Sequence, residues 1–222
     1  MTQIINLTLE RHCIHVSDRK LSRRGPWGGF TSFDKNSNKL VVVAARDALA
    51  TISYTGLAFL GGRPTDRFLA EVAAGRSLGN DDFMMSAGDG RTISDIGSIS
   101  LRILDQLSLA WARLPVAEQA TSFEVLLSGW KSRGPIMVPF HWEISRMSTV
   151  LGWQFRVKRW ARMWPSWNRF TLSAAPDVAP GVLESLTMKL REVPAPRVDS
   201  ACRVLEETMA KIAERKRPAN PS

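Results

Sequence analysis

Residues 39–75 read KLVVVAARDALATISYTGLAFLGGRPTDRFLAEVAAG, and the spacing of the apolar residues changes within this stretch. The first half predicts two strands, 39–45 and 48–56, of which the first is apolar on both faces, as in a buried strand. After Pro64 the apolar residues recur with a period of about 3.6, which predicts an amphipathic helix that ends at Gly75. The residues expected on its buried side are Phe68, Leu69, Val72 and Ala73. This stretch therefore predicts a strand hairpin followed directly by a helix.

The residues before this stretch predict a second hairpin, with strands over 2–9 and 11–18. Its first strand would place Ile5, Leu7 and Leu9 on one face and Thr2, Ile4, Asn6 and Thr8 on the other. Between the two hairpins lies RRGPWGGFTSFDKNSN, residues 23–38. We predict a loop here, because its glycines and Pro26 exclude regular structure.

A long helix is predicted after a polar, glycine-rich loop that runs to Gly90. Thr92 and Asp95 stand three residues apart, like a capping box, and the helix is expected to continue to about Leu114. Its apolar stripe consists of Ile96, Ile99, Ile103, Leu107 and Ala110. The loop itself has neither a phosphate-binding pattern nor calcium-loop spacing, so we interpret it as a surface loop.

The second half repeats the order of strands followed by helices. Strands are expected over 122–130, 135–146, 153–160 and 169–175, and helices over 181–193 and 198–215. Antiparallel hairpins in two blocks, each followed by two helices, predict an α+β fold, and a four-layer sandwich with helices outside and two sheets inside would use this order. We expect one domain over residues 1–215 and a disordered basic, proline-containing tail over 216–222.

The composition is that of one globular domain, with 222 residues, 44% of them hydrophobic and 23% charged. No long uncharged apolar run and no signal peptide is evident, and two cysteines fit a reducing compartment, so we expect a cytoplasmic protein without membrane contact. The net charge of +9 permits nucleic-acid or acidic partners without selecting one.

Two segments together, residues 2–22 and 38–71, resemble the first half of proteasome β-type subunits and their bacterial relatives, the N-terminal-nucleophile hydrolases. In that family a threonine is the mature N-terminus, a D-R pair ends the second strand, an N-x-K or K-K pair begins the third, and a glycine closes the fourth. This sequence has Thr2, Asp18 with Arg19, Asn38 with Lys39, and Gly56 in that order, with Asp18 sixteen residues after Thr2.

The resemblance implies a threonine amidohydrolase or peptidase that needs no cofactor and works in a ring or another homo-oligomer. Removal of Met1 before the small Thr2 would free an amine of pKa about 7.7–8.0, which can take the hydroxyl proton. Lys39 would tune this pair, Asp18 would hold Lys39, and the amide of Gly56 would stabilise the oxyanion of a peptide or amide substrate.

The second half departs from the family pattern. The family has a serine-glycine-serine turn, for which LSAAP offers Ser173 followed by Ala174 and Ala175, and a later aspartate-x-x-serine-glycine stretch with further strands, which has no counterpart here. The same fold acting as an inactive assembly or binding module is therefore the alternative. Taken singly, Thr2 is also an ordinary second residue, Asp18 part of a turn, Lys39 a strand-edge charge and Gly56 a turn glycine.

Two other features suggest competing functions. His12, Cys13 and His15 do not share one face of a strand, so a metal site would need His141 and Cys202 from afar, and Cys13 with His15 would not converge on a substrate. The segment 153–170, WQFRVKRWARMWPSWNRF, mixes tryptophan with basic residues. It is interpreted as a subunit contact, as core with arginines that reach solvent or, third, as a nucleic-acid contact.

Overall fold

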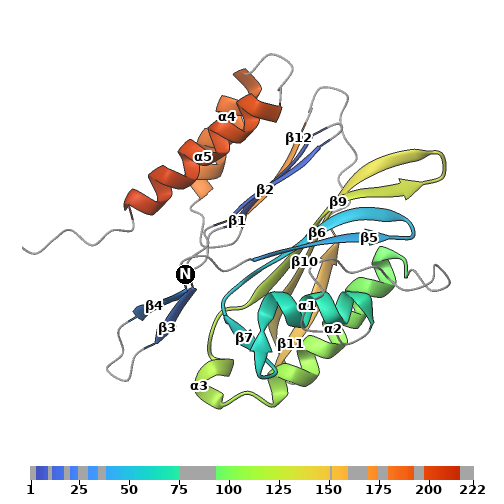
Figure 1. The fold of residues 1–222 in the computed structure, drawn as a ribbon, viewed down its shortest axis with the longest axis vertical. Helices are drawn as coiled ribbons and strands as arrows, with labels where there is room; N and C mark the ends of the chain where they lie inside the picture. The colour runs from blue at the N-terminus through green and yellow to red at the C-terminus, as the bar shows by residue number, and fades with distance from the viewer. Residues whose placement is uncertain are drawn as a thin grey trace, which may run out of the picture. The chain divides into compact units, whose positions relative to one another are not determined.

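A five-stranded antiparallel sheet is the centre of the larger of two units into which the chain divides, residues Arg19–Trp164 (Figure 1). The strand order is β11-β10-β9-β6-β5. The strands are β5 (Leu40–Ala45), β6 (Ala48–Thr55), β9 (Glu124–Arg133), β10 (Ile136–Thr149) and β11 (Gly152–Arg159). The computed structural model of the chain describes residues 4–9, 12–17, 21–24, 30–34, 39–75, 94–150, 152–159, 170–174, 180–192 and 198–215.

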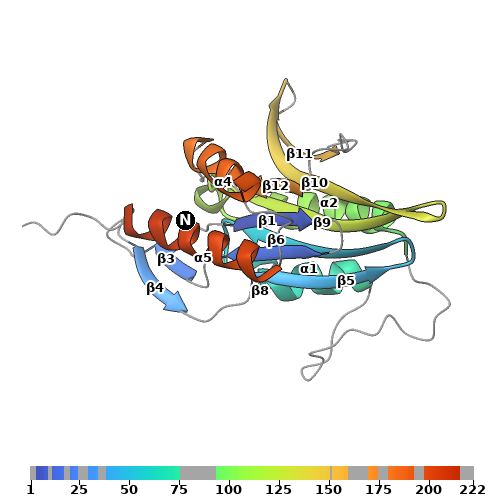
Figure 2. The same ribbon diagram turned by 90° about the horizontal axis from the view of Figure 1, so that it is seen from above.

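Two helices cover one face of this sheet, α1 (Thr65–Ala74) and α2 (Ile96–Ala112), and a single turn, α3 (Val116–Gln119), follows. α1 contacts β5 and β6 while α2 contacts α1 and β11 (Figure 1 and Figure 2). Alternate strand residues point at the helices because side chains of a strand alternate between its faces. The core so formed includes Val43, Ile52, Leu127, Trp142, Ile144, Phe68, Leu69, Ile103 and Leu107.

The helix ends follow simple local rules, with one difference from expectation. α1 begins after Pro64 and ends at Gly75, which has the left-handed conformation that glycine adopts without a steric cost. For α2 the N-cap is Asp95 itself, whose carboxylate accepts a hydrogen bond from Ser98 N at 2.9 Å. The predicted capping box with Asp95 at its third position is therefore wrong, and Thr92 lies outside the described residues. The predicted apolar stripe of α2 is confirmed.

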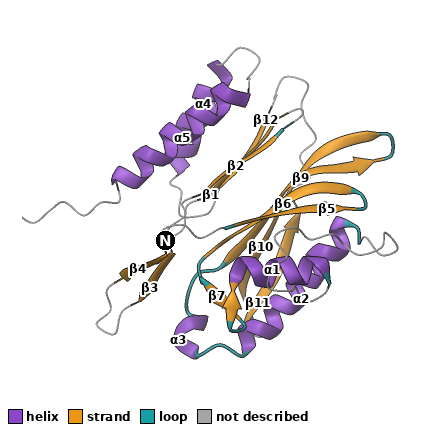
Figure 3. Ribbon diagram, in the orientation of Figure 1, coloured by secondary structure: helices purple, strands orange, loops and turns teal. Residues whose placement is uncertain are grey.

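The smaller unit, Met1–Asp18 with Pro165–Ser222, joins the two ends of the sequence. Its sheet has the order β12-β1-β2 and consists of β1 (Ile4–Leu9), β2 (Cys13–Ser17) and β12 (Phe170–Ala174). The helices α4 (Pro180–Glu192) and α5 (Val198–Arg215), shown in purple in Figure 3, belong to the same unit. Their buried residues Leu186, Leu190 and Leu205 pack with Ile5 and Leu7 of β1.

Three expectations about strands are corrected. Residues 23–38 are not entirely loop, because β3 (Leu21–Arg24) pairs with β4 (Phe30–Asp34); the glycines and Pro26 fall between these two strands. The two-residue strands β7 (Phe59–Leu60) and β8 (Arg63–Pro64) were not predicted either. β5 is the edge strand of the described sheet and not a buried one, and Val42 on its outer face is 65% exposed.

The fold class is α+β, with antiparallel sheets and helices that follow the strands in each half of the chain. The two predicted hairpins, the first helix, the strands of the second half and the last two helices are confirmed within a few residues at their ends. The predicted tail, residues 216–222, lies outside the described residues.

Candidate functional site

Two of the five residues assigned to the predicted active site lie at the same end of the β5–β6 hairpin. Lys39 immediately precedes β5, whose first residue, Leu40, pairs with Ser53 of β6. Gly56 immediately follows the last residue of β6. The antiparallel pairing of β5 with β6 therefore places Lys39 and Gly56 at the same end of these two strands.

The Lys39 side chain is buried, with 1% of its surface exposed. Lysine is almost never buried to this extent unless its ammonium group is paired or has a chemical role, because removing a charge from water is costly. The interpretation of Lys39 as a solvated charge at a strand edge does not agree with this burial.

Glycine is the only type of residue that the backbone at position 56 tolerates. Its φ is +100°, which L-residues with side chains rarely adopt, and a Cβ at this position would lie 2.2 Å from the carbonyl oxygen of Ser122. The backbone of the segment that leads into β9 therefore lies directly against the backbone of residue 56. This requirement holds for an oxyanion-binding glycine and for a structural one alike.

The remaining predicted residues belong to the smaller unit. Thr2 and Asp18 lie outside the described residues, but the strands that flank them pair at Ile4 and Ser17. Ser173 is the Cα partner of Asn6 in the β1–β12 ladder. The register therefore places Ser173 two residues along β1 from Ile4.

One face of the β12-β1-β2 sheet is polar and buried. Asn6 and Thr8 on β1 are buried, and they lie opposite His15 and Cys13 on β2. The Asn6 amide oxygen is hydrogen-bonded to His15 Nδ1, and Thr8 Oγ1 donates to Cys13 Sγ at 3.8 Å. Burial lowers the pKa of His15 to about 4, so the imidazole is neutral near pH 7. Its Nε2 has no partner among the described residues.

The five-stranded sheet also has a polar face, opposite α1 and α2. Ser128 of β9 lies between Thr51 of β6 and His141 of β10, and Thr51 Oγ1 is 3.2 Å from Ser128 Oγ. His141 is 7% exposed, and neither ring nitrogen has a partner within the described part of the chain. Burial lowers the pKa of His141 to about 4, although Glu143 acts in the opposite direction.

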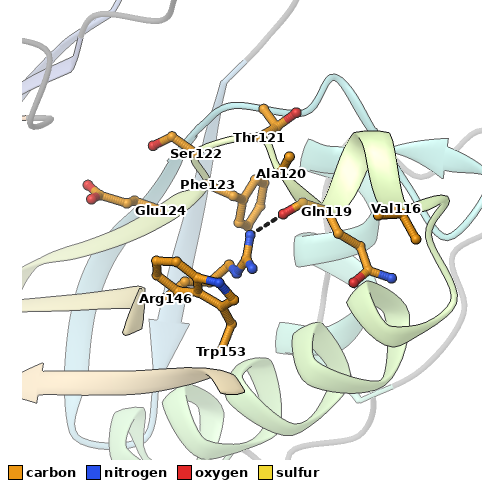
Figure 4. Close-up of a pocket in the computed structure, with 9 residues that line it drawn as sticks. All are labelled: Val116, Gln119, Ala120, Thr121, Ser122, Phe123, Glu124, Arg146 and Trp153. Carbon is orange, nitrogen blue, oxygen red and sulfur yellow. Dashed lines mark hydrogen bonds between the residues drawn. The ribbon is translucent and has the colours of Figure 1, made fainter. Parts of the chain in front are cut away.

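The third candidate site surrounds Arg146 of β10, a residue that the sequence analysis did not single out (Figure 4). Its guanidinium carbon lies 4.9 Å from the ring centroid of Trp111 and 4.9 Å from that of Trp153. One Nη donates to the backbone carbonyl of Gln119. Burial lowers the pKa of Arg146 below its usual value. We call Arg146 with Trp111 and Trp153 the arginine clamp.

Two cavities adjoin the arginine clamp, with volumes of about 600 Å³ and 480 Å³. Both are lined by Gln119, Arg146 and Trp153, so these residues form the wall that the cavities share. The larger cavity also has Thr121, Ser122 and Phe123 in its wall, as Figure 4 shows. The arginine clamp therefore borders a cavity on more than one side.

A sequence signal for Arg146 exists in hindsight. Phe140, Trp142 and Ile144 are buried at every second position of β10, and Arg146 continues this series on the same face. A charged residue at an apolar position of a period-two pattern is unusual, and it usually indicates a paired or functional group.

Within the segment 153–170 the structure describes Phe170, the first residue of β12, and residues 153–159 of β11. There Arg159 lies 5.0 Å from the Trp142 ring and Lys158 Nζ is 3.1 Å from a carboxylate oxygen of Glu143. Phe155 is buried, but Trp153, Arg156, Lys158 and Arg159 are exposed, so the described part of the segment combines a core residue with exposed basic and aromatic residues. Residues 160–169 lie outside the described part.

No group of three potential metal ligands occurs among the described residues, and both Cys13 and Cys202 are free thiols. Within the same residues, no helix is both long enough and apolar enough to cross a lipid bilayer.

Comparison of the chain with protein-family models, with curated proteins and with solved structures found no match.

Proposed function

We propose that the chain is a proteasome-like N-terminal-nucleophile amidohydrolase or peptidase, in which Thr2 becomes the first residue after loss of Met1. The observation that carries the proposal is the burial of Lys39, 1% exposed, at the same hairpin end as Gly56. A buried lysine beside a required glycine fits a site that needs a cation and a backbone donor.

In the proposed reaction the Thr2 hydroxyl attacks the carbonyl carbon of an amide, and the Thr2 amine takes the hydroxyl proton. The backbone N–H of Gly56 stabilises the oxyanion of the tetrahedral intermediate, and Lys39 favours a neutral terminal amine. The amine then gives its proton to the leaving nitrogen as the C–N bond breaks. Water hydrolyses the resulting ester and regenerates Thr2. Asp18 and Ser173 are assigned to hold Lys39 and the terminal amine.

The proposal includes a four-layer arrangement with helices outside and two sheets inside. In each unit the helices pack on one face of the sheet, and in each half of the chain the helices follow the strands, as this arrangement would require. It also includes a reducing, cytoplasmic compartment, which the two free thiols support.

The first test is the intact mass of the protein from its native host, resolved to one methionine. A mass without Met1 supports the proposal, and retention of Met1 contradicts it, because an acylated Thr2 nitrogen cannot act as a base. The second test is hydrolysis of a fluorogenic peptide amide. Thr2→Ala should abolish turnover, while Thr2→Ser keeps both the hydroxyl and the amine and should retain part of it.

Two further variants separate chemistry from folding. Inserting a lysine between Met1 and Thr2 prevents methionine removal and should abolish turnover without altering any residue of the fold. Lys39→Arg keeps a charge in a different shape and should lower turnover at least tenfold, since the proposal requires a compact ammonium group. Turnover that survives both changes contradicts the assigned roles.

The alternative, the same fold as an inactive assembly module, is favoured by exposed apolar residues on α2 and α3. Leu101, Leu109 and Val116 are 49%, 54% and 83% exposed. Such residues suit contact with further copies of the chain. Thr2→Ala separates the functions, because it leaves assembly unchanged in both cases and stops turnover only in the first. Light scattering after gel filtration measures the assembly.

A further inference from the structure

We propose that the arginine clamp binds a carboxylate group, carried either by a small organic acid or by the C-terminus of a peptide. This inference does not use Thr2, Lys39 or Gly56, and it holds whether or not the chain is a hydrolase.

The N–H edge of the Arg146 guanidinium is the part that can bind a ligand, as the positions of the two tryptophan rings show. Trp111 and Trp153 both lie about 5 Å from the guanidinium carbon, at 4.9 Å each. Such contacts with indole rings stabilise the positive charge of the guanidinium and fix the orientation of its plane. A guanidinium has five N–H donors, of which Arg146 gives one to the Gln119 carbonyl. No acceptor for the other donors lies among the described residues, so they can bind a planar, bidentate ligand.

Arg146 has no acidic partner among the described residues. Three other arginines of this unit do have one, since Arg46 pairs with Asp95, and Arg63 and Arg67 both pair with Glu71. Arg46 and Arg63 are exposed, whereas Arg146 is partly buried and has no carboxylate of the described residues within ion-pair distance. A partly buried cation without a counter-ion is the arrangement expected of a site whose anion comes from a ligand.

The cavity walls favour a carboxylate over a phosphate. Thr121 and Ser122 add hydroxyl groups to the larger cavity, and Phe123 adds an apolar surface for the rest of the ligand. Glu124 lines the same cavity, and Asp105 lines the smaller one. Both carboxylates line cavities that Arg146 also lines, so they disfavour a dianionic ligand more strongly than a monoanionic one, because like-charge repulsion grows with ligand charge.

The competing explanation is that Arg146 only fastens α3 to β10 through the Gln119 carbonyl. A purely structural role predicts that mutation of Arg146 lowers stability and that no ligand binds. The experiment must therefore measure ligand binding, and it must measure it at the arginine clamp.

The binding experiment uses full-length protein labelled with 5-fluorotryptophan, which gives eight ¹⁹F signals for the eight tryptophans. The Trp153→Phe variant identifies the Trp153 signal. The probes are N-acetyl-leucine, N-acetyl-alanyl-leucine, their C-terminal amides, acetate and inorganic phosphate. We expect the Trp153 signal to shift with the acids, and the amides to bind at least tenfold more weakly. Tighter binding of the dipeptide acid than of N-acetyl-leucine and acetate indicates a peptide terminus, and equal binding indicates a small acid.

Three variants locate the site. Arg146→Gln should weaken acid binding at least tenfold, and Arg146→Lys, which keeps the charge but not the bidentate fork, should weaken it by a smaller factor. Arg133→Gln is the matched control, because Arg133 is exposed at the end of β9 and should leave the affinity unchanged. If Arg146→Gln does not fold, the Arg146→Lys result decides.

The proposal is overturned if acids and amides shift the Trp153 signal alike, if neither binds at 10 mM, or if the folded Arg146 variants bind the acids as tightly as the unchanged protein does. Stronger binding of phosphate than of the acids also overturns it. Thr2→Ala should bind the acid normally, so failure of the proposed hydrolase and failure of this site are distinguishable.

Discussion

Gly56 shows how one position can be fixed by its neighbours before any function is considered. Its φ is +100° and the Ser122 carbonyl oxygen is 2.2 Å from the position of a Cβ. We expect Gly56→Ala to lower the free energy of unfolding by about 2–4 kcal/mol, the sum of backbone strain and a backbone clash. Urea denaturation measures this change.

The matched control for Gly56→Ala is Gly62→Ala. Gly62 has a φ of +78°, but no heavy atom lies within 4 Å of its Cβ position. Only the strain of a positive φ remains, so a loss of about 1 kcal/mol is expected. Equal losses for the two variants would show that the contact with Ser122 is unimportant.

The edge strand β5 predicts opposite outcomes for adjacent valines. Val43 is 7% exposed and belongs to the main core, whereas Val42 is 65% exposed. Val43→Ala should cost about 1–2 kcal/mol of stability, because buried methyl groups are lost, and Val42→Ala less than about 0.5 kcal/mol. Chemical denaturation of both variants tests this; similar losses would mean that β5 is covered on both faces.

The start of α2 depends on a residue from another element. Asp47, in the turn between β5 and β6, accepts a hydrogen bond from Ile96 N at 2.8 Å and lies 3.3 Å from Lys131 Nζ. A carboxylate at a helix N-terminus satisfies a free N–H group and complements the helix dipole. Asp47→Ala should therefore cost about 1–2 kcal/mol in denaturation experiments.

Asp47→Asn separates the hydrogen bond from the charge. The amide oxygen still accepts from Ile96 N, so we expect this variant to retain at least half of the stability that Asp47→Ala loses. Asp105→Ala, on the exposed face of the middle of α2, is the control and should change stability by less than about 0.5 kcal/mol. An asparagine variant as unstable as the alanine variant would assign the effect to charge alone.

The elements were largely predictable from local patterns, and the exceptions have physical causes. Helices with one buried face, such as α2, carry a period that can be counted, and in β1 the apolar Ile5 and Leu7 alternate with the polar Asn6 and Thr8. β3 and β4 are too short for a clear period and are separated by glycines in the sequence, so local patterns predict a loop over residues 23–38. The exposure of Val42 was not predictable, because an apolar strand does not tell whether it lies at the edge or in the middle of a sheet.

The candidate sites were predictable only in part. The order of motifs in the sequence suggested Lys39 and Gly56, but no local pattern around residue 39 predicts that its side chain is only 1% exposed. Arg146 of β10 contacts Trp111 of α2 and Trp153 of β11. No local sequence pattern predicts contacts between residues on three separate elements. The roles of Thr2, Asp18 and Ser173 stay predictions.

Acid sensitivity is a property of the whole chain, since one buried histidine lies in each unit. For His15 and His141 the pKa falls from 6.5 to about 4 on folding, mainly because of burial. Below pH 6.5 the unfolded chain therefore binds more protons than the folded one, and stability falls as the pH falls. At pH 5 each histidine should remove about 2 kcal/mol, and below pH 4 about 3 kcal/mol.

Denaturation midpoints between pH 7.5 and 4.5 measure this dependence. His141→Gln should remove roughly half of the histidine contribution to the slope. A slope that is unchanged in His141→Gln would mean that this imidazole is already protonated in the folded protein or is not buried in solution.

The pairing of β1 with β12 also sets an order of events in time. Ile5 finds its partner at Ala174, so the side of β1 that pairs with β12 stays open until residues 170–174 have been synthesised, although β1 can pair with β2 much earlier. The five-stranded sheet is built from neighbouring hairpins joined by one crossover and can form before this third strand arrives. An apolar strand with one unpaired side is a target for chaperones and for other nascent chains. Slow synthesis should therefore prolong the exposure of this side of β1, and the yield of folded protein should depend on how soon residues 170–174 follow.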